Sequence, residues 1–146
     1  MNILIVEDDS FKLQAIERCL APRGDTIASA ASLRSAMTAL ENSFFDFIIL
    51  DMAIPSHTSE VGAIDTYSQP VGGLDVLMFI ASNDRPEQIV ILTQYPTVEY
   101  DRAHIRLKDF IQILRDDGIT NVVDVVRFGD DTPWSEALLT ALGEAH

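Results

Sequence analysis

The sequence predicts an α/β fold in which helices cover both faces of a parallel β-sheet. Three observations predict it. Short runs rich in Ile and Val are apolar almost without interruption, which is typical of strands buried on both faces. Segments in which apolar residues recur at helical spacing separate these runs, and residues that favour helix ends mark their boundaries. Strands that alternate with helices in this way form parallel sheets through right-handed crossovers.

The apolar runs predict five strands, each followed by a helix. The predicted strands are residues 3–6, 26–30, 44–50, 89–92 and 122–126. The run at 26–30 is weaker than the other four, and Asp46 interrupts the run at 44–50. The order along the chain is therefore a strand and a helix, repeated five times.

Each predicted helix carries one apolar stripe at a spacing of three and four residues. The stripes are Phe11, Leu13, Ala15, Ile16, Cys19 and Leu20 in the first helix; Leu33, Ala36, Met37 and Leu40 in the second; Leu74, Leu77, Met78 and Ala81 in the third; Ala103, Leu107, Phe110, Ile111 and Leu114 in the fourth; and Trp134, Leu138, Ala141 and Leu142 in the fifth. Ser10 and Ser32 stand where N-caps are expected, and Gly24 and Gly118 follow the first and fourth helices.

The chain of 146 residues is predicted to form a single domain over residues 1–146, because single domains mostly run to about 100–150 residues. Two segments are longer than a compact repeat needs. One is a long insertion loop at about 52–72, which is either a tolerated surface insertion or a lid or docking loop. The other is an extended fourth helix, predicted at about 97–117.

The charge balance limits the partners of the chain. Asp and Glu number 23 against 10 Lys and Arg, so the formal net charge is −13. Such a surface repels phosphate backbones and anionic lipids, which disfavours direct binding of nucleic acid or of a membrane surface. Cys19 is the one cysteine, and the sequence has no secretory signal or membrane-spanning stretch. We therefore expect a cytoplasmic protein without an internal disulfide.

Polar residues follow the predicted strands at the points where ligands bind in open parallel α/β sheets. Glu7, Asp8 and Asp9 follow the first strand and Asp51 follows the third; Thr93 follows the fourth, and Arg127 ends the fifth. Carboxylates that lie close together repel each other and need a cation. A hard divalent ion such as Mg²⁺ prefers carboxylate oxygens. An aspartate beside that ion is able to attack a phosphoryl donor, with a hydroxyl and a cation holding the remaining oxygens.

Three motifs occur in this order at the strand ends: Ile3-Leu4-Ile5-Val6-Glu7-Asp8-Asp9, Ile48-Ile49-Leu50-Asp51-Met52-Ala53-Ile54-Pro55 and Ile91-Leu92-Thr93. Together they resemble the receiver domains of two-component response regulators. The resemblance implies a flavodoxin-like (βα)5 fold, doubly wound, with strand order 2-1-3-4-5. It covers nearly the whole chain in topology and is strongest in its motifs up to Thr93.

The resemblance also implies roles for individual residues. Glu7 and Asp8 match the acidic pair that holds Mg²⁺, and Asp51 matches the phosphoryl acceptor. The carbonyl of Ala53 would complete the metal ligands, and Thr93 matches the hydroxyl that moves toward the phosphoryl group. Asp9, a third acid in the same run, remains an alternative to Asp8 as the acid that faces the metal.

The residues at the ends of the fourth and fifth predicted strands depart from the family pattern. The family has Lys followed by Pro at the end of the fifth strand, whereas this chain has Arg127 followed by Phe128. Arginine keeps the charge, but its planar guanidinium differs from a compact ammonium group. The bulky Gln94 stands after Thr93, where the family has a small residue.

Two functions fit these observations. The first is a stand-alone receiver domain that accepts a phosphoryl group on Asp51 from a histidine kinase or phosphotransfer protein. It would have at most autophosphatase activity, and would act as a monomer or weak dimer on a downstream protein. The alternative is a pseudo-receiver that binds a partner constitutively without phosphorylation. An aspartate-based phosphatase is disfavoured because position 53, where it needs a second acid, is Ala53. The acidic turn after the first strand excludes a glycine-rich nucleotide-binding loop.

Overall fold

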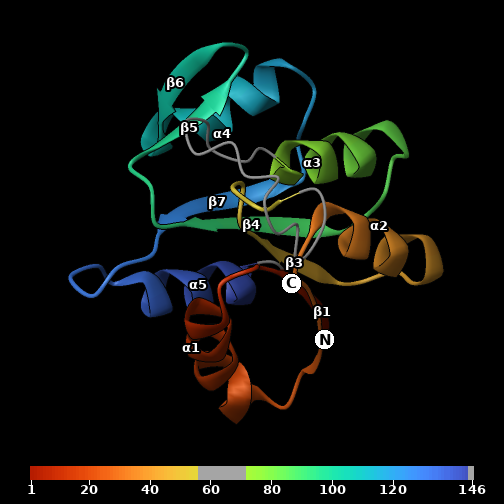
Figure 1. Ribbon diagram of the computed structural model, residues 1–146, viewed down its shortest axis with the longest axis vertical. Coiled ribbons are helices and arrows are strands. Elements are labelled where there is room, and N and C mark those ends of the chain that lie inside the picture. Colours follow the sequence, from red (N-terminus) through yellow and green to blue (C-terminus); the bar gives the residue numbers. More distant parts are fainter. Residues whose placement is uncertain (56–71, 145–146) are drawn as a thin grey trace, which may run out of the picture.

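The computed structural model describes residues 1–55 and 72–144. A central sheet is covered by helices on both faces, and a small hairpin lies beside one of the helices (Figure 1). Most of the predicted loop at 52–72 lies outside the described residues. None of the helices in the described part has the length and apolar character that a bilayer crossing requires.

The sheet has five parallel strands in the order β2-β1-β3-β4-β7. Its strands are β1 (Asn2–Val6), β2 (Thr26–Ala30), β3 (Phe47–Leu50), β4 (Gln88–Thr93) and β7 (Val122–Arg127). Because β7 is the fifth strand of this sheet in chain order, the predicted order 2-1-3-4-5 is confirmed. The third strand begins three residues later than predicted, at Phe47, since Asp46 accepts a hydrogen bond from the Asn2 backbone and Phe44 is exposed.

The helices divide between the two faces of the sheet (Figure 1). On one face lie α1 (Ser10–Leu20) and α5 (Trp134–Glu144), and on the other lie α2 (Leu33–Asn42), α3 (Gly72–Ser82) and α4 (Leu107–Asp116). A 3₁₀ turn, η1 (Ala21–Arg23), follows α1 and ends at the left-handed Gly24. The four inner residues of β1 and all four of β3 are buried, as continuous apolar runs predict.

The helix caps agree with the sequence at α2 and differ at α1. Ser32 caps α2, because its hydroxyl accepts a hydrogen bond from the Ser35 backbone N–H at 3.1 Å. The prediction of Ser10 as the cap of α1 is wrong, since Ser10 is already helical. The cap is Asp9, whose Oδ1 accepts a hydrogen bond from the Phe11 N–H at 2.9 Å. The Asp9 side chain therefore serves as the N-cap of α1.

The prediction of one extended helix at about 97–117 is wrong. The segment forms a hairpin of β5 (Thr97–Tyr100) and β6 (Ala103–Arg106), followed by the shorter α4. Asp101 and Arg102 have φ angles of 51° and 64°, which gives the two-residue turn that suits the twist of a hairpin. Apolar alternation from Val98 onward fits the hairpin, whereas helical spacing holds only from Leu107.

A buried ion pair lies at the amino-terminal edge of the sheet. Glu87, directly before β4, is fully buried, and its two oxygens accept hydrogen bonds from Arg85 at 3.0 and 2.7 Å. Glu87 also accepts a hydrogen bond from the Phe45 N–H at 3.1 Å. The remaining Arg85 donors reach the carbonyls of Leu40 and Ser43. Every oxygen of this carboxylate is thus satisfied.

Candidate functional site

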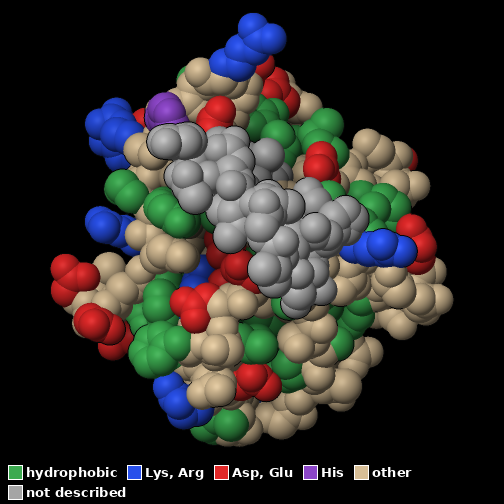
Figure 2. Space-filling model, viewed as in Figure 1, with side chains coloured by type: hydrophobic (Ala, Val, Ile, Leu, Met, Phe, Trp, Pro, Cys, Tyr) green, Lys and Arg blue, Asp and Glu red, His purple; other side chains and the backbone are tan. Residues whose placement is uncertain are grey.

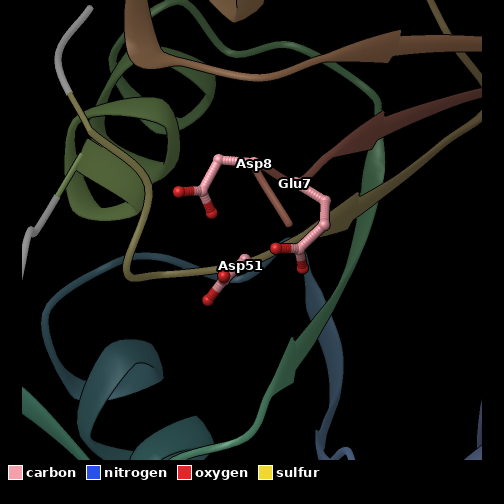
Figure 3. Close-up of side chains that lie close together, drawn as sticks. All are labelled: Glu7, Asp8 and Asp51. Atoms are coloured by element: carbon pink, nitrogen blue, oxygen red, sulfur yellow. The ribbon is translucent and has the colours of Figure 1, made fainter. Parts of the chain in front are cut away.

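Three carboxylates meet at the carboxyl-terminal edge of the sheet. Glu7 and Asp8 follow β1, and Asp51 follows β3, whose last residue pairs with the last residue of β1. One carboxylate oxygen from each of the three lies within 4.8 Å of the others. The side chains point toward one another across the end of the sheet (Figure 3). Parallel strands thus bring together acids that are more than 40 residues apart in the chain.

Burial decides the electrostatics of this cluster. Glu7 and Asp51 are each 2% exposed, whereas Asp8 is exposed and forms the open side of the site. Burial raises the pKa of Glu7 to about 8, and the charge of Asp51 adds to this shift while that of Lys12 opposes it. Burial and the charge of Asp51 also raise the pKa of Asp8. A bound cation would favour the ionised form of both carboxylates and displace their protons, because metal ligands must be deprotonated.

A lysine completes the site, and the sequence interpretation missed it. Lys12 in α1 is 1% exposed, and its Nζ lies 2.7 Å from Glu7 Oε1 and 3.7 Å from Asp51 Oδ2. Figure 2 shows Asp and Glu side chains beside a Lys or Arg side chain in the middle of one molecular face. A signal in the sequence could have found it, because Lys12 precedes the buried Ile16 and Leu20 by four and eight residues. Lys12 therefore lies on the inward stripe of its helix.

The backbone around Asp51 is held in place by the start of α3. The Ala53 N–H donates a hydrogen bond to Asp51 Oδ1 at 3.0 Å, and the Gly73 N–H donates one to the Met52 carbonyl at 3.1 Å. A Cβ atom at Gly73 would overlap the backbone of Met52 and the carbonyl oxygen of Asp51. Position 73 must therefore be glycine for α3 to begin this close to the acid.

Thr93 and Arg127 lie side by side at the ends of β4 and β7. Thr93 is buried at 1% exposure, and its Oγ1 accepts a hydrogen bond from the Tyr95 N–H at 3.2 Å. Arg127 pairs with Thr93 along the backbone, but its side chain is exposed. Within the described residues, the structure records no ion pair between Arg127 and the acidic cluster.

The donor set fits a hard divalent cation. Glu7, Asp8 and Asp51 offer only carboxylate oxygens, which are the ligands that Mg²⁺ prefers, and the exposed Asp8 leaves one side open to water and a phosphoryl group. When ionised, three carboxylates against the ammonium of Lys12 leave two negative charges in excess. Asp9 is used as the cap of α1, which favours Asp8 as the second acid of the pair.

Comparison with known proteins gives the family. A sequence model described as "Response regulator receiver domain" matches residues 3–115. The chain belongs to this family. Detocs response regulatory protein DtcB of Vibrio alginolyticus is 28% identical to this receiver domain over 149 residues, which cover 96% of this chain and 98% of that protein. The uncharacterized protein y4jS of Sinorhizobium fredii is 35% identical over 101 residues, covering 64% of this chain and 22% of that protein.

Solved structures share the fold of this receiver domain. The response regulator TrrA of Thermotoga maritima, in complex with Mg²⁺ and BeF, has a TM-score of 0.65 at 18% identity, covering 99% of this chain and 98% of that one. The N-terminal domain of a response regulator/sensory box/GGDEF protein of Carboxydothermus hydrogenoformans has a TM-score of 0.68 at 18% identity, covering 99% and 93%. At these identities the similarity concerns the fold.

Proposed function

We propose that this receiver domain accepts a phosphoryl group on Asp51 from a phosphohistidine of a histidine kinase or phosphotransfer protein. One observation carries the proposal. Asp51 is buried at the end of β3, within 4.8 Å of two further carboxylates, in a cluster with too few cations to neutralise it. A binding surface gains nothing from buried like charges, because they destabilise the fold unless a ligand compensates them.

The reaction requires little of the protein beyond positioning and charge. A carboxylate oxygen of Asp51 attacks the phosphorus atom and forms the new P–O bond, while the P–N bond to the donor imidazole breaks and the nitrogen keeps the electron pair. Glu7, Asp8, Asp51 and the Ala53 carbonyl would hold Mg²⁺, which neutralises charge on the transferring phosphoryl oxygens when bound. The Ala53 N–H fixes the orientation of Asp51 through its hydrogen bond to Oδ1.

The signal would pass to a downstream protein through a change at the surface. Thr93 lies one strand away from the acceptor, and its hydroxyl accepts the Tyr95 N–H, so rotation of Thr93 toward a phosphoryl oxygen breaks a contact with the segment that leads into β5. The hairpin of β5 and β6 and helix α4 follow that segment directly. They are the part of the surface nearest to this change along the chain.

The test is intact-mass spectrometry after incubation with Mg²⁺ and acetyl phosphate, with Asp51→Asn as the matched variant. We expect one phosphoryl adduct in the wild type and none in the variant. Isothermal titration calorimetry measures Mg²⁺ binding in parallel. No adduct together with no Mg²⁺ response would overturn the proposal in favour of a constitutive pseudo-receiver.

A further inference from the structure

Lys12 is an unusual residue for the interior of a protein. Lysine is almost never fully buried unless its charge is paired, because moving an ammonium group out of water is costly. Lys12 is 1% exposed, whereas Lys108, the other lysine of the chain, is exposed on α4. A specific set of acceptors must therefore hold the ammonium group of Lys12 in place.

Those acceptors come from two different parts of the site. Besides Glu7 and Asp51, the Nζ of Lys12 donates hydrogen bonds to the Leu92 carbonyl at 2.6 Å and to Gln94 Oε1 at 3.2 Å. Leu92 and Gln94 flank Thr93 at the end of β4. One ammonium group thus contacts both the acidic cluster and the strand end that leads away from it.

An aromatic ring lies beside the ammonium group at the place where the family has proline. The ring centroid of Phe128 is 5.6 Å from Lys12 Nζ, and Phe128 packs in turn against Trp134. A cation over an aromatic face is stabilised, most strongly where water is excluded. Phe128 therefore stabilises the ammonium group of Lys12, which reaches the site from α1 and not from β7.

The geometry of β7 explains why Arg127 does not occupy this position. The register between β4 and β7 shifts by one residue after Ile89, so that Val90 pairs with Asp124 and Thr93 with Arg127. A one-residue shift exchanges the faces toward which the later side chains point. Val125 packs on the α4 side and Val126 on the α1 side, and Arg127 then ends the strand exposed.

We propose, on the basis of the proposed function, that Lys12 is the cation that holds the phosphoryl group on Asp51. It takes the role that the family pattern assigns to a residue on the fifth strand of the sheet. Its Nζ is already 3.7 Å from Asp51 Oδ2, and a phosphoryl group attached to Asp51 adds oxygens that are strong acceptors. The ammonium group exchanges its contact with Glu7 for these oxygens, which leaves Glu7 to the metal.

The step keeps its atoms and charges in balance. With acetyl phosphate, a carboxylate oxygen of Asp51 forms a bond to phosphorus, the bond from phosphorus to the acetyl oxygen breaks, and acetate leaves with the electron pair. Lys12 takes no part in the bond changes and acts through its charge and hydrogen bonds. Its movement toward the phosphoryl group strains or breaks the hydrogen bond to Gln94, which connects α1 to the segment before β5.

The first test compares three Lys or Arg→Met variants by the rate of adduct formation with Mg²⁺ and acetyl phosphate. Loss of one preorganised charge from a buried phosphoryl site is expected to slow Lys12→Met by about 100-fold. Lys108→Met is the matched control at an exposed lysine and should keep the wild-type rate, while Arg127→Met tests the rival cation and should slow the reaction far less than Lys12→Met. Lys12→Arg keeps the charge and should restore part of the rate.

The second test uses the wild-type chain, so it does not depend on the folding of a Lys12 variant. Because Lys12 and Lys108 are the only two lysines, ¹⁵N-lysine labelling gives one side-chain signal from each. We expect the Lys12 Nζ signal to shift when beryllium fluoride is added to the Mg²⁺-loaded protein, with no shift for Lys108 and none in Asp51→Asn. Binding of beryllium fluoride is followed independently through its own ¹⁹F signal.

The outcomes separate this inference from the function on which it rests. If the wild type forms no adduct and calorimetry detects no Mg²⁺ binding, the proposed function fails. If the wild type forms the adduct but the Lys12 signal does not shift on beryllium fluoride binding, the inference is overturned while the function stands. An adduct rate that falls in Arg127→Met and not in a folded Lys12→Met would likewise assign the role to Arg127.

Discussion

The two edges of the sheet each bury a carboxylate next to a cation, but they compensate it to different degrees. At the amino-terminal edge, Glu87 receives two hydrogen bonds from Arg85 and one from the backbone, and these contacts lower its pKa despite its burial. At the carboxyl-terminal edge, Glu7 shares the ammonium group of Lys12 with Asp51, and burial raises its pKa to about 8.

The difference shows how a structural ion pair and a reactive site are distinguished. Both acids are at least 98% buried, so burial alone does not separate them. The donors separate them: Glu87 accepts two hydrogen bonds from Arg85 and one from the Phe45 N–H, whereas Glu7 accepts one from the Asp9 N–H and shares the ammonium group of Lys12 with Asp51. Two buried carboxylates that share one cation are ready to bind a second cation. The pKa directions of Glu87 and Glu7 are the measurable sign of this contrast.

The largest expected loss of stability comes from breaking the ion pair between Glu87 and Arg85. Glu87→Gln leaves Arg85, 9% exposed, without its carboxylate, and should lower the free energy of unfolding by about 3–5 kcal/mol. Glu7→Gln, measured without divalent cations at pH 7, should change it by less than about 1 kcal/mol, because glutamine resembles the protonated acid that a pKa of about 8 favours. Urea unfolding of both variants checks the contrast, and equal losses would contradict it.

The contribution of Glu87 should also depend on pH. Its pKa in the folded protein is lower than the usual value of 4.5, so the unfolded chain binds a proton more readily and the stabilisation is present above pH 4.5. It is lost as the pH falls through the lowered folded value. The stability difference between wild type and Glu87→Gln should therefore be constant from pH 6 to 8 and shrink in acid, as measured by urea unfolding across the range.

A smaller change in stability should come from Mg²⁺ binding, and only at the carboxyl-terminal edge, where Glu7, Asp8 and Asp51 lie. At about 100 times its dissociation constant, a ligand of the folded state stabilises a protein by about 2.7 kcal/mol. We expect Mg²⁺ to raise the Tm of the wild type, to raise that of Glu87→Gln by a similar amount, and to have little effect on Asp51→Asn. Thermal unfolding with Mg²⁺ against EDTA measures the shift. A similar rise in Asp51→Asn would place the Mg²⁺ elsewhere.

The smallest effect is expected for an exposed cation at the same edge as the acidic cluster. Arg127 is exposed, so Arg127→Ala should change the free energy of unfolding by no more than about 0.5 kcal/mol. Lys12 and Arg127 would then differ in their contribution to stability because Lys12 is buried among acceptors and Arg127 is exposed. A loss well above that value in urea unfolding would show that Arg127 has partners in solution that stabilise the fold.

Most of the fold and half of the site could be predicted from the sequence. Continuous apolar runs give the five strands of the sheet because burial on both faces requires them, and the acids that follow Val6 and Leu50 converge because parallel strands end at one edge. The sequence could not predict the hairpin at 97–106, since its short alternating runs also contain residues at helical spacing. It also left Asp8 and Asp9 undistinguished.

The tertiary structure alone decided which cation serves the acids. The sequence by itself determined the strands, their connection by helices and the position of Asp51, because these follow from local patterns and from the rules of parallel sheets. The burial of Lys12 depends on a contact with Leu92, 80 residues away, and the exposure of Arg127 depends on a register shift between β4 and β7. The spacing of Lys12 from Ile16 and Leu20 indicates which way its side chain faces, but the partners of Lys12 and the register of β7 are set only when the whole sheet is assembled.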